Sequence, residues 1–405
     1  MKCGLLGRKL GHSYSPAIHQ QLGDYEYRLY EKEPEELEAF LRCGDWDGVN
    51  VTMPYKQAVI PYLDHLSPAA SQLGAVNTIV RREGKLIGHN TDYFGFQSML
   101  ERCSLSPSGK KCLVLGSGGA SKVAVQVLAE QGANVVVISR SGEHNYQNIG
   151  HHKDAALIVN TTPVGMYPQV GISPVDLGQF PQLEGVLDVI YNPATTKLLL
   201  DARSKGVPAI NGLWMLVAQA VEASWLMTGC DIRECVIPYV YRRMRQQMEN
   251  IILIGMPGCG KSTIGSLVAD KLRKYFVDTD AEIEKLAQKS IPRIFAEDGE
   301  AAFRELETQV LAEYGKRSGL VIATGGGCVT KSENKPLLHQ NGVCFWLQRD
   351  VETLATAGRP LSVDLNRMYD QRMPLYAAFA HTIIENRLAP EDAAAAIVAY
   401  WEEMI

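Results

Sequence analysis

The sequence lacks the features that mark several protein classes. Its nine cysteines are scattered, odd in number and never spaced C-x-x-C, which argues against a disulfide framework or a zinc site and favours reduced thiols in a cytoplasm. No apolar run approaches the roughly 18 residues that span a bilayer. The formal net charge of -5 shows no basic excess of the kind that nucleic acids or anionic membranes attract. We therefore expect a cytoplasmic protein with small-molecule partners and with no nucleic-acid or membrane partner.

The length and composition predict a globular protein of more than one domain. At about 150 residues per domain, a chain of 405 residues is expected to form two or three domains. Hydrophobic residues make up 46% of the sequence and charged residues 21%. Each domain can therefore bury a core of its own.

A phosphate-binding motif lies well past the middle of the chain. The string GMPGCGKST at 255–263 fits G-x-x-x-x-G-K-[ST], with Gly255, Gly260, Lys261 and Ser262 at the defining positions. The glycines let backbone N–H groups turn onto phosphate oxygens, the lysine adds a charge for the outer phosphates, and the serine hydroxyl can ligate magnesium. An isoleucine-rich run precedes the motif and a helical pattern follows it, which predicts a nucleoside triphosphate site between a strand and a helix.

Charged residues and glycines follow in three later motifs. In YFVDTDAEIE, Asp278 and Asp280 can face magnesium and a substrate hydroxyl, or can cap and begin a helix. In DGEAAFRELE, Arg304 and Glu307 have helical i, i+3 spacing, which suits a binding site or a surface ion pair. VIATGGGCV predicts an apolar strand followed by glycines 325–327, where the backbone can approach a ligand closely.

Taken in this order, and with GRPL and QRMPLY further on, the motifs of residues 250–405 resemble those of shikimate kinases. The resemblance implies a P-loop kinase domain with a parallel sheet over residues 248–405. It also implies that shikimate is held by Asp280, Arg304, Gly326 and Arg372. The two arginines would grip the carboxylate of shikimate, and Asp280 its hydroxyls.

The same resemblance implies the residues that bind ATP and magnesium. The residues implied for ATP are Gly258, Cys259, Gly260, Lys261, Ser262, Thr263, Arg359 and Arg387. Ser262 and Asp278 would hold Mg²⁺ with ATP. Lys261, Asp280 and Arg359 would be the catalytic residues, with Arg359 reaching the transferring phosphoryl group from a lid.

Residues 111–141 predict a dinucleotide-binding unit. The stretch has a strand, a glycine-rich turn, a helix and a second strand, and the turn places Gly116, Gly118 and Gly119 in a G-x-G-G-A variant of the dinucleotide fingerprint. The second strand ends in ISRS, without the acidic residue that accepts from the ribose 2′-OH of NAD. Because the guanidinium of Arg140 suits a 2′-phosphate, the sequence favours NADP.

Small polar residues upstream predict a substrate site. Ser15 and Pro16 are predicted as N-cap and N1 of a helix, which would favour an anion such as a carboxylate or would serve capping alone. Lys56 ends the predicted strand GVNVTMPYK, while Asn77 and Asp92 lie in glycine-flanked turns. A lysine and an aspartate in one cleft can pass a proton to a carbonyl oxygen as that carbonyl receives hydride.

These strings, together with NTTPVGM, DVIYNPATT and NGLWMLVAQA, resemble shikimate dehydrogenases as far as about residue 240. The resemblance implies a substrate lobe at 1–100, completed by 211–245, and a Rossmann-like NADP lobe at 101–210. The residues implied for the substrate are Ser13, Ser15, Thr52, Asn77, Asp92, Tyr191 and Gln219, with Lys56 and Asp92 as the catalytic pair. Those implied for NADP(H) are Gly116, Gly118, Gly119, Ala120, Ser139, Arg140 and Met215.

The two resemblances together imply an α/β protein with two activities. The first part would reduce 3-dehydroshikimate to shikimate with NADPH, and the second would phosphorylate shikimate to shikimate 3-phosphate with ATP. One alternative is an NAD-dependent quinate/shikimate dehydrogenase fused to a different small-metabolite kinase, against which Arg140 argues. The other is that one half is a degenerate binding module, against which the intact lysine and aspartate pairs of both halves argue.

Overall fold

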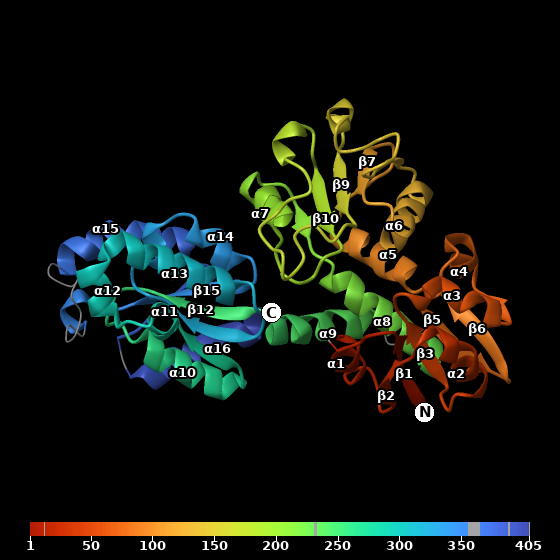
Figure 1. Cartoon of the computed structure of the whole chain (residues 1–405), viewed down its shortest axis with the longest axis horizontal. Helices are drawn as coiled ribbons and strands as arrows, with labels where there is room; N and C mark the ends of the chain where they lie inside the picture. The colour runs from red at the N-terminus through yellow and green to blue at the C-terminus, as the bar shows by residue number, and fades with distance from the viewer. Residues whose placement is uncertain (12, 231–232, 355–364, 388, 405) are drawn as a thin grey trace. The chain divides into compact units, whose positions relative to one another are not determined.

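The computed structural model describes residues 1–11, 13–230, 233–354, 365–387 and 389–404 (Figure 1). The chain forms two compact units. The first contains Met1–Val164, Ser173–Tyr191 and Asp201–Met244, and the second contains Gly165–Ile172, Asn192–Leu200 and Arg245–Ile405. Every sheet in the described residues is packed with helices, so the α/β class predicted from the sequence is confirmed.

The first unit begins with a mixed sheet. Its strands are β1 (Lys2–Gly7), β2 (Glu26–Glu31), β3 (Gly48–Val51), β4 (His65–Leu66), β5 (Thr78–Arg82) and β6 (Lys85–His89), in the order β2-β1-β3-β5-β6-β4. The helices of this part are α1 (Ser15–His19), α2 (Leu37–Cys43), α3 (Tyr55–Ala58), α4 (Pro68–Leu73) and α5 (Asp92–Arg102), joined later by α8 (Leu213–Thr228) and α9 (Arg233–Met248). β1 and β3 pair in parallel, whereas β5 runs antiparallel to both of its neighbours. α8 packs against α5, so a late segment completes the early sheet.

The second sheet of this unit is parallel throughout the described strands. It consists of β7 (Lys111–Leu115), β8 (Asn134–Ile138), β9 (Leu157–Asn160), β10 (Gly185–Asp188) and β11 (Ala209–Ile210), in the order β11-β10-β9-β7-β8, with α6 (Gly119–Glu130). The boundary between the two units falls inside α7 (Lys197–Ser204), after Leu200. β9 and β10 are buried along their whole length, as expected for strands covered on both faces. The predicted strand, turn, helix and strand of residues 111–141 are β7, α6 and β8.

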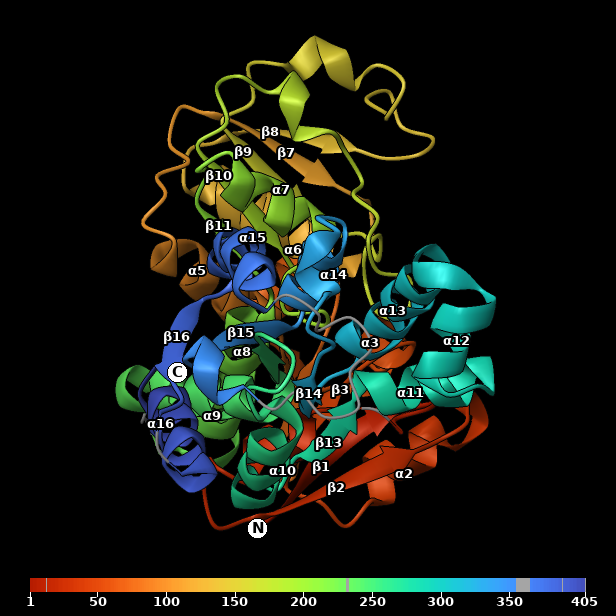
Figure 2. The same ribbon diagram turned by 90° about the vertical axis from the view of Figure 1, so that its left-hand side faces the viewer.

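The second unit is built on another parallel sheet. Its strands are β12 (Asn250–Ile254), β13 (Tyr275–Asp278), β14 (Leu320–Ala323), β15 (Gly342–Gln348) and β16 (Thr382–Glu385), in the order β13-β14-β12-β15-β16. The helices are α10 (Lys261–Leu272), α11 (Thr279–Ala287), α12 (Ile291–Glu297), α13 (Gly299–Gly315), α14 (Asn334–His339), α15 (Leu365–Phe379) and α16 (Pro390–Met404). Figures 1 and 2 place α10 and α16 on one face of the sheet and α13, α14 and α15 on the other. Central strand β12 is therefore fully buried.

Two local predictions were wrong. Ser15 is not an N-cap, because α1 already begins at Ser15 with Tyr14 in the N-cap position; the hydroxyl of Ser13 instead accepts a hydrogen bond from the Ser15 N–H at 3.2 Å. Lys56 does not end a strand, because β3 stops at Val51 and Lys56 lies in the short helix α3. At the second place the Tyr55 N–H donates to Thr52 O at 2.9 Å, so a turn replaces the end of the predicted strand.

Candidate active sites

A cavity of about 530 Å³ in the first unit gathers residues from distant parts of the chain. Its lining comes from β1, β3, α3, the start of α5 and α8, among other segments. It includes every residue that the sequence predicts for the substrate and the proton-transfer pair: Ser13, Ser15, Thr52, Lys56, Asn77, Asp92, Tyr191 and Gln219. Ala120 and Met215, predicted for the cofactor, line the same cavity. The residues predicted for one substrate therefore face one common space.

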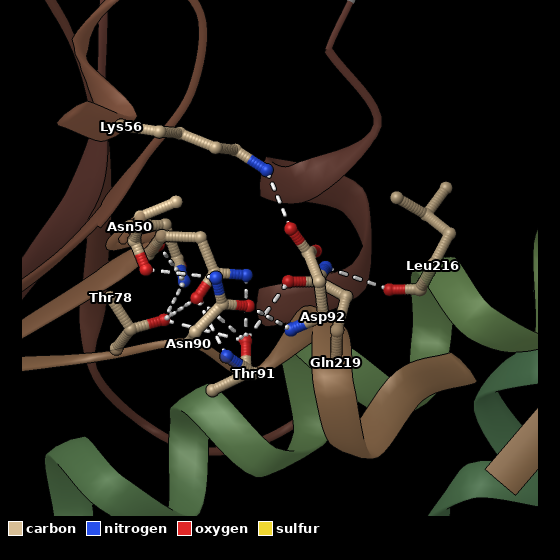
Figure 3. Close-up of polar contacts among 10 residues, drawn as sticks. Asn50, Lys56, Thr78, Asn90, Thr91, Asp92, Leu216 and Gln219 are labelled. Carbon is tan, nitrogen blue, oxygen red and sulfur yellow. Dashed lines mark hydrogen bonds and ion pairs between the residues drawn. The ribbon is translucent and has the colours of Figure 1, made fainter. Parts of the chain in front are cut away.

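Lys56 and Asp92 form an ion pair in this cavity (Figure 3). Lys56 Nζ lies 2.6 Å from Asp92 Oδ2, and the two side chains are 28% and 20% exposed. Asp92 is the first residue of α5, where the positive end of the helix dipole favours a carboxylate. Asn90 Oδ1 accepts from the Asp92 N–H at 3.2 Å and fixes this helix start. A partly shielded ammonium and a carboxylate thus lie close enough to share a proton.

A chain of buried hydrogen bonds orients the amide side chains behind this pair. Thr91 donates its N–H to Asn77 Oδ1 at 2.7 Å, and its hydroxyl accepts from Asn77 Nδ2 at 3.1 Å. The Thr91 hydroxyl also lies 3.4 Å from Gln219 Oε1, while Gln219 Nε2 donates to Leu216 O at 2.8 Å. Figure 3 shows the contacts around Thr91. Thr91, which was not predicted as a site residue, therefore fixes how two predicted substrate residues present their amides.

Asn50 is a second cavity residue that was not predicted from the sequence. It lines the cavity from the centre of β3, accepts from the Tyr27 hydroxyl at 2.8 Å and donates to Thr78 Oγ1 at 3.0 Å. Its side chain is buried among apolar strand neighbours. A buried amide in a strand was visible in the sequence as a polar residue at an apolar position, and this was the signal that could have identified it.

A second cavity of the first unit, of about 720 Å³, lies at the end of β7 and β8. Gly116, Gly118, Ser139 and Arg140 line it, as the dinucleotide fingerprint predicts, whereas Gly119 begins α6 and does not line it. Gly116 has φ +106°, and a Cβ there would lie 2.9 Å from Thr161 Oγ1. The turn therefore requires glycine both for its backbone conformation and for its packing.

A cavity of about 510 Å³ in the second unit contains most residues predicted for the other reaction. The predicted residues that line it are Gly258, Gly260, Lys261, Ser262, Thr263, Asp278, Asp280, Arg304, Gly326 and Arg372. Cys259 is fully buried in the core, so its side chain is not available to a nucleotide. Arg387 is absent from the described lining, being exposed and paired with Glu385 at 3.7 Å. Arg359 lies outside the described residues.

The loop before α10 has the geometry of an anion site. Gly255, Gly258 and Gly260 have φ values of +148°, +84° and +93°. Residues other than glycine rarely adopt such backbone angles. Lys261 Nζ donates to the carbonyls of Gly255 and Met256 at 2.9 and 3.0 Å, so the ammonium group is held back against the loop. Backbone donors and a lysine thus meet at the N-terminus of a long helix.

A hydroxyl and a carboxylate lie together beside this loop. Ser262 Oγ donates to Asp278 Oδ2 at 2.5 Å. Asp278 also caps α11, because its Oδ1 accepts from the Asp280 N–H at 3.0 Å. Asp278 can therefore cap α11 through Oδ1 and still offer Oδ2, beside the Ser262 hydroxyl, as an oxygen ligand. Two hard oxygen donors at the mouth of a phosphate loop suit Mg²⁺.

Arg304 and Glu307 form a buried ion pair, so the surface ion pair considered from the sequence is wrong. Arg304 Nη1 lies 2.8 Å from Glu307 Oε2, with Arg304 8% exposed and Glu307 fully buried. Burial raises the pKa of Glu307, and the neighbouring guanidinium opposes that shift. Because the pair lines the cavity, the guanidinium of Arg304 is placed at the cavity wall in a shielded position.

The glycines after β14 make room for side chains. A Cβ on Gly327 would lie 2.2 Å from the Arg304 guanidinium, one on Gly325 would lie 2.5 Å from Glu307 Oε1, and one on Gly326 would lie 2.6 Å from Pro257 Cδ. The Gly326 carbonyl accepts from Arg372 Nη1 at 3.2 Å and from the Tyr376 hydroxyl at 2.5 Å. These glycines therefore allow the charged side chains to converge, a role that the motif alone did not indicate.

Known proteins share both halves of this architecture. Residues 5–79 match the family model of the shikimate dehydrogenase substrate binding domain. The "Shikimate dehydrogenase (NADP(+))" of Clostridium perfringens is 37% identical over 265 residues, covering 60% of this chain and 97% of that relative. The chain belongs to the shikimate dehydrogenase family.

Solved structures of this shikimate dehydrogenase family agree with the fold of the first part. Shikimate dehydrogenase 1 from Peptoclostridium difficile is 38% identical with a TM-score of 0.54, covering 60% of this chain and 97% of that one. The Thermus thermophilus enzyme, solved in complex with NADP(H) and shikimate, is 32% identical with a TM-score of 0.54, covering 60% and 99%. Beyond that part, residues 257–402 match the shikimate kinase family model. This shikimate dehydrogenase family member therefore carries a kinase domain after its dehydrogenase part.

One further cluster of side chains in this family member consists of residue types that can bind a metal ion. Candidate donor atoms of His339, Cys344 and His381 lie within 4.8 Å of one another. The Cys344 N–H donates to His381 Nδ1 at 2.9 Å, so a neutral ring carries its proton on Nε2 and keeps no lone pair for a metal. Burial also raises the pKa of the Cys344 thiol far above its ordinary value. We therefore assign no metal to this cluster.

The length and hydrophobicity of the helices can be compared with those of a membrane span. Across the described ranges of the chain, no helix combines the length and the apolar character that crossing a bilayer requires.

Proposed function

We propose that the chain catalyses two consecutive reactions, the reduction of 3-dehydroshikimate to shikimate with NADPH and the phosphorylation of shikimate with ATP. The observation that carries the first reaction is the Lys56–Asp92 ion pair in the cavity that holds all of the predicted substrate residues. The observation that carries the second is the P-loop beside the buried Arg304. The product of the first site is the substrate of the second.

In the first reaction Lys56 and Asp92 would carry out the proton transfer to the substrate. When bound, NADPH supplies the hydride. The Lys56 ammonium would donate a proton to the carbonyl oxygen of the substrate as charge develops there, and Asp92 would hold the lysine in position and share its proton. Asn77 and Gln219, fixed by Thr91, would orient the ring hydroxyls. These roles require a substrate that carries both a carbonyl and neighbouring hydroxyls.

The dinucleotide fits the second cavity of the first unit. Gly116 forms a turn with a φ that other residues rarely adopt, and Arg140 lines the cavity without an acidic neighbour in the described lining. Gly116, Gly118 and α6 would hold the pyrophosphate. Arg140 would bind the 2′-phosphate, which distinguishes NADP from NAD.

Arg140→Ala is expected to raise the KM for NADPH by about 10-fold or more, because a charge-assisted contact to the 2′-phosphate is lost. Turnover with NADH should stay nearly unchanged, since NADH has no such phosphate. Steady-state kinetics with both nucleotides on one preparation measure this change. Wild-type protein that used NADH as efficiently as NADPH would contradict the assignment.

In the second reaction the protein supplies positioning and positive charge. Gly258, Gly260 and Lys261 would hold the phosphates, while Ser262 and Asp278 are the oxygen donors that would take the Mg²⁺ bound with ATP. Arg304 and Arg372 would bind the carboxylate of shikimate, with Asp280 at its hydroxyls. We also propose that Arg359 reaches the transferring phosphoryl group.

Tyr376→Phe is expected to raise the KM for shikimate by about 2- to 10-fold, the effect of one lost hydrogen bond. The Gly326 carbonyl would then keep only Arg372 as a donor, and that arginine would be released less readily to the substrate carboxylate. Kinetics with varied shikimate measure the change. Tyr314→Phe removes a comparable hydroxyl, which donates to Glu282, and should leave this KM unchanged. An equal change in both variants would contradict the role of Tyr376.

We propose the domain limits 1–100 with 211–245 for the substrate lobe, 101–210 for the NADP lobe and 248–405 for the kinase. The last limit is supported by the boundary of the two units, which falls between Met244 and Arg245 inside α9. A cytoplasmic location is supported by the nine cysteines, which are thiols and not disulfides.

A coupled assay tests the proposed function as a whole. The purified chain is given 3-dehydroshikimate, NADPH and ATP with Mg²⁺, and NADP⁺, ADP and shikimate 3-phosphate are measured. Formation of all three in equal amounts is the expected result. Oxidation of NADPH without ADP formation, even with added shikimate, would instead indicate a degenerate kinase half.

A further inference from the structure

The loop that follows β8 folds back beside the dinucleotide cavity. The Ser139 N–H donates to His144 O at 3.1 Å, and Ser139 forms a parallel bridge with Asn145. The chain therefore leaves the cavity edge at Arg140 and returns to the same edge within a few residues. The residue at that return is Tyr146, which lines the cavity together with Ser139 and Arg140.

Two asparagines hold the returning segment in place. Asn145 Nδ2 donates to Gly142 O at 3.2 Å, and Asn145 Oδ1 accepts from the Gln147 N–H at 2.9 Å. Asn148 Oδ1 accepts from the Asn145 N–H at 2.8 Å, and Asn148 Nδ2 donates to Glu143 O at 2.8 Å. These side chains replace secondary structure in the loop. The backbone on both sides of Tyr146 is therefore fixed by hydrogen bonds.

The Tyr146 ring lies in a setting that suits an aromatic ligand. The ring is half-buried in the cavity wall, and burial raises the pKa of its hydroxyl while the charge of Arg140 opposes that shift. Apart from Arg140, the rest of the described lining consists of glycine, small hydroxyl residues, valine and prolines, such as Thr161 and Pro163. Within that lining Tyr146 is the only aromatic side chain.

We propose that Tyr146 is the stacking platform for the adenine ring of the dinucleotide, next to the 2′-phosphate contact of Arg140. The inference rests on the proposed use of NADPH and extends it to a residue that the fingerprint motif does not include. A flat, neutral ring at the cavity wall can stack on any purine face. Arg140 then separates NADP from NAD, while Tyr146 contributes equally to the binding of both.

Tyr146→Ala tests this proposal through nucleotide binding to the full chain. Calorimetric titration should show dissociation constants for NADP⁺ and NAD⁺ that rise by the same factor, about 5- to 100-fold, the range of a lost base–aromatic stack. Tyr146→Phe keeps the ring and should stay within about twofold of wild type. Arg140→Ala is the matched control, because it should weaken NADP⁺ alone.

Three outcomes would overturn the role of Tyr146. These are unchanged affinity in Tyr146→Ala, a loss confined to NADP⁺, and a loss in Tyr146→Phe as large as in the alanine variant, which would assign the effect to the hydroxyl. Shikimate kinase activity and the circular dichroism spectrum of each variant show whether it has folded, and if the alanine variant has not, the phenylalanine variant decides. Oxidation of shikimate by the wild-type protein with NADP⁺ tests the proposed function separately. A failure of the Tyr146 role can therefore be distinguished from a failure of the proposed function.

Discussion

Lys56→Ala is expected to lower kcat for 3-dehydroshikimate reduction by about 10²- to 10⁴-fold, the usual contribution of a general acid or base. The KM should change much less, because several other side chains that line the cavity are proposed to hold the substrate. The reason is the geometry of the ion pair, in which Lys56 Nζ lies 2.6 Å from a carboxylate and faces the cavity. Stopped-flow or steady-state NADPH oxidation measures kcat directly.

The control for this variant is Lys85→Ala, which removes an exposed lysine of the same lobe that does not line the cavity. It should behave as wild type. Kinase activity of the Lys56→Ala preparation should also be unchanged, since the kinase residues lie in the second unit. A kcat within about threefold of wild type would make Lys56 a binding residue only, and the proton-transfer mechanism would be wrong.

Arg304→Ala is expected to lower kcat/KM for shikimate phosphorylation by about 30- to 5,000-fold, as expected when one partner of a buried charged contact is removed. Arg304→Lys should not restore the activity, because a planar guanidinium binds a carboxylate through two parallel hydrogen bonds and an ammonium does not. Kinetics with varied shikimate at saturating ATP give the comparison. Full shikimate affinity in the lysine variant would remove the bidentate assignment.

The same substitution also tests the burial of the pair. Arg304→Ala leaves the fully buried Glu307 without its counter-charge, and such a loss costs about 3–5 kcal/mol of folding free energy. Arg293→Ala is the matched control, since Arg293 pairs with Glu297 on an exposed helix face with 63% of its side chain accessible. Its removal should leave the unfolding temperature nearly unchanged, because an exposed ion pair contributes little to stability. Thermal unfolding of both variants provides the measurement, and similar losses would contradict the role of burial.

Much of the fold and of both sites was predictable because it depends on short segments. The glycines of the P-loop and of the dinucleotide turn require positive φ, and such conformations are set by the residue itself. The strands next to these turns are continuous apolar runs, which are typical of buried parallel sheets. The α/β class and the residues of the phosphate sites therefore followed from local sequence.

Other features depended on segments far apart in the chain. Lys56 meets Asp92 across 36 residues, and Thr91 reaches Gln219 across 128. Neither spacing has a sequence period, so only the packing of α8 against α5 could bring Thr91 to Gln219. Thr91 was missed for this reason, because its role follows from partners that are distant in sequence. Asn50 differs, since a polar residue inside a predicted apolar strand was a signal in the sequence itself.

By itself, then, the sequence determined where the glycine turns lie and which charged side chains are candidates for the chemistry, because backbone conformation and charge belong to each residue. Only the tertiary structure decided which of those side chains are buried. Arg304 and Glu307 have the spacing of an ordinary surface pair, yet both lie in the cavity wall. Burial is a property of everything that packs around a residue, and the strength of an electrostatic contact follows from it.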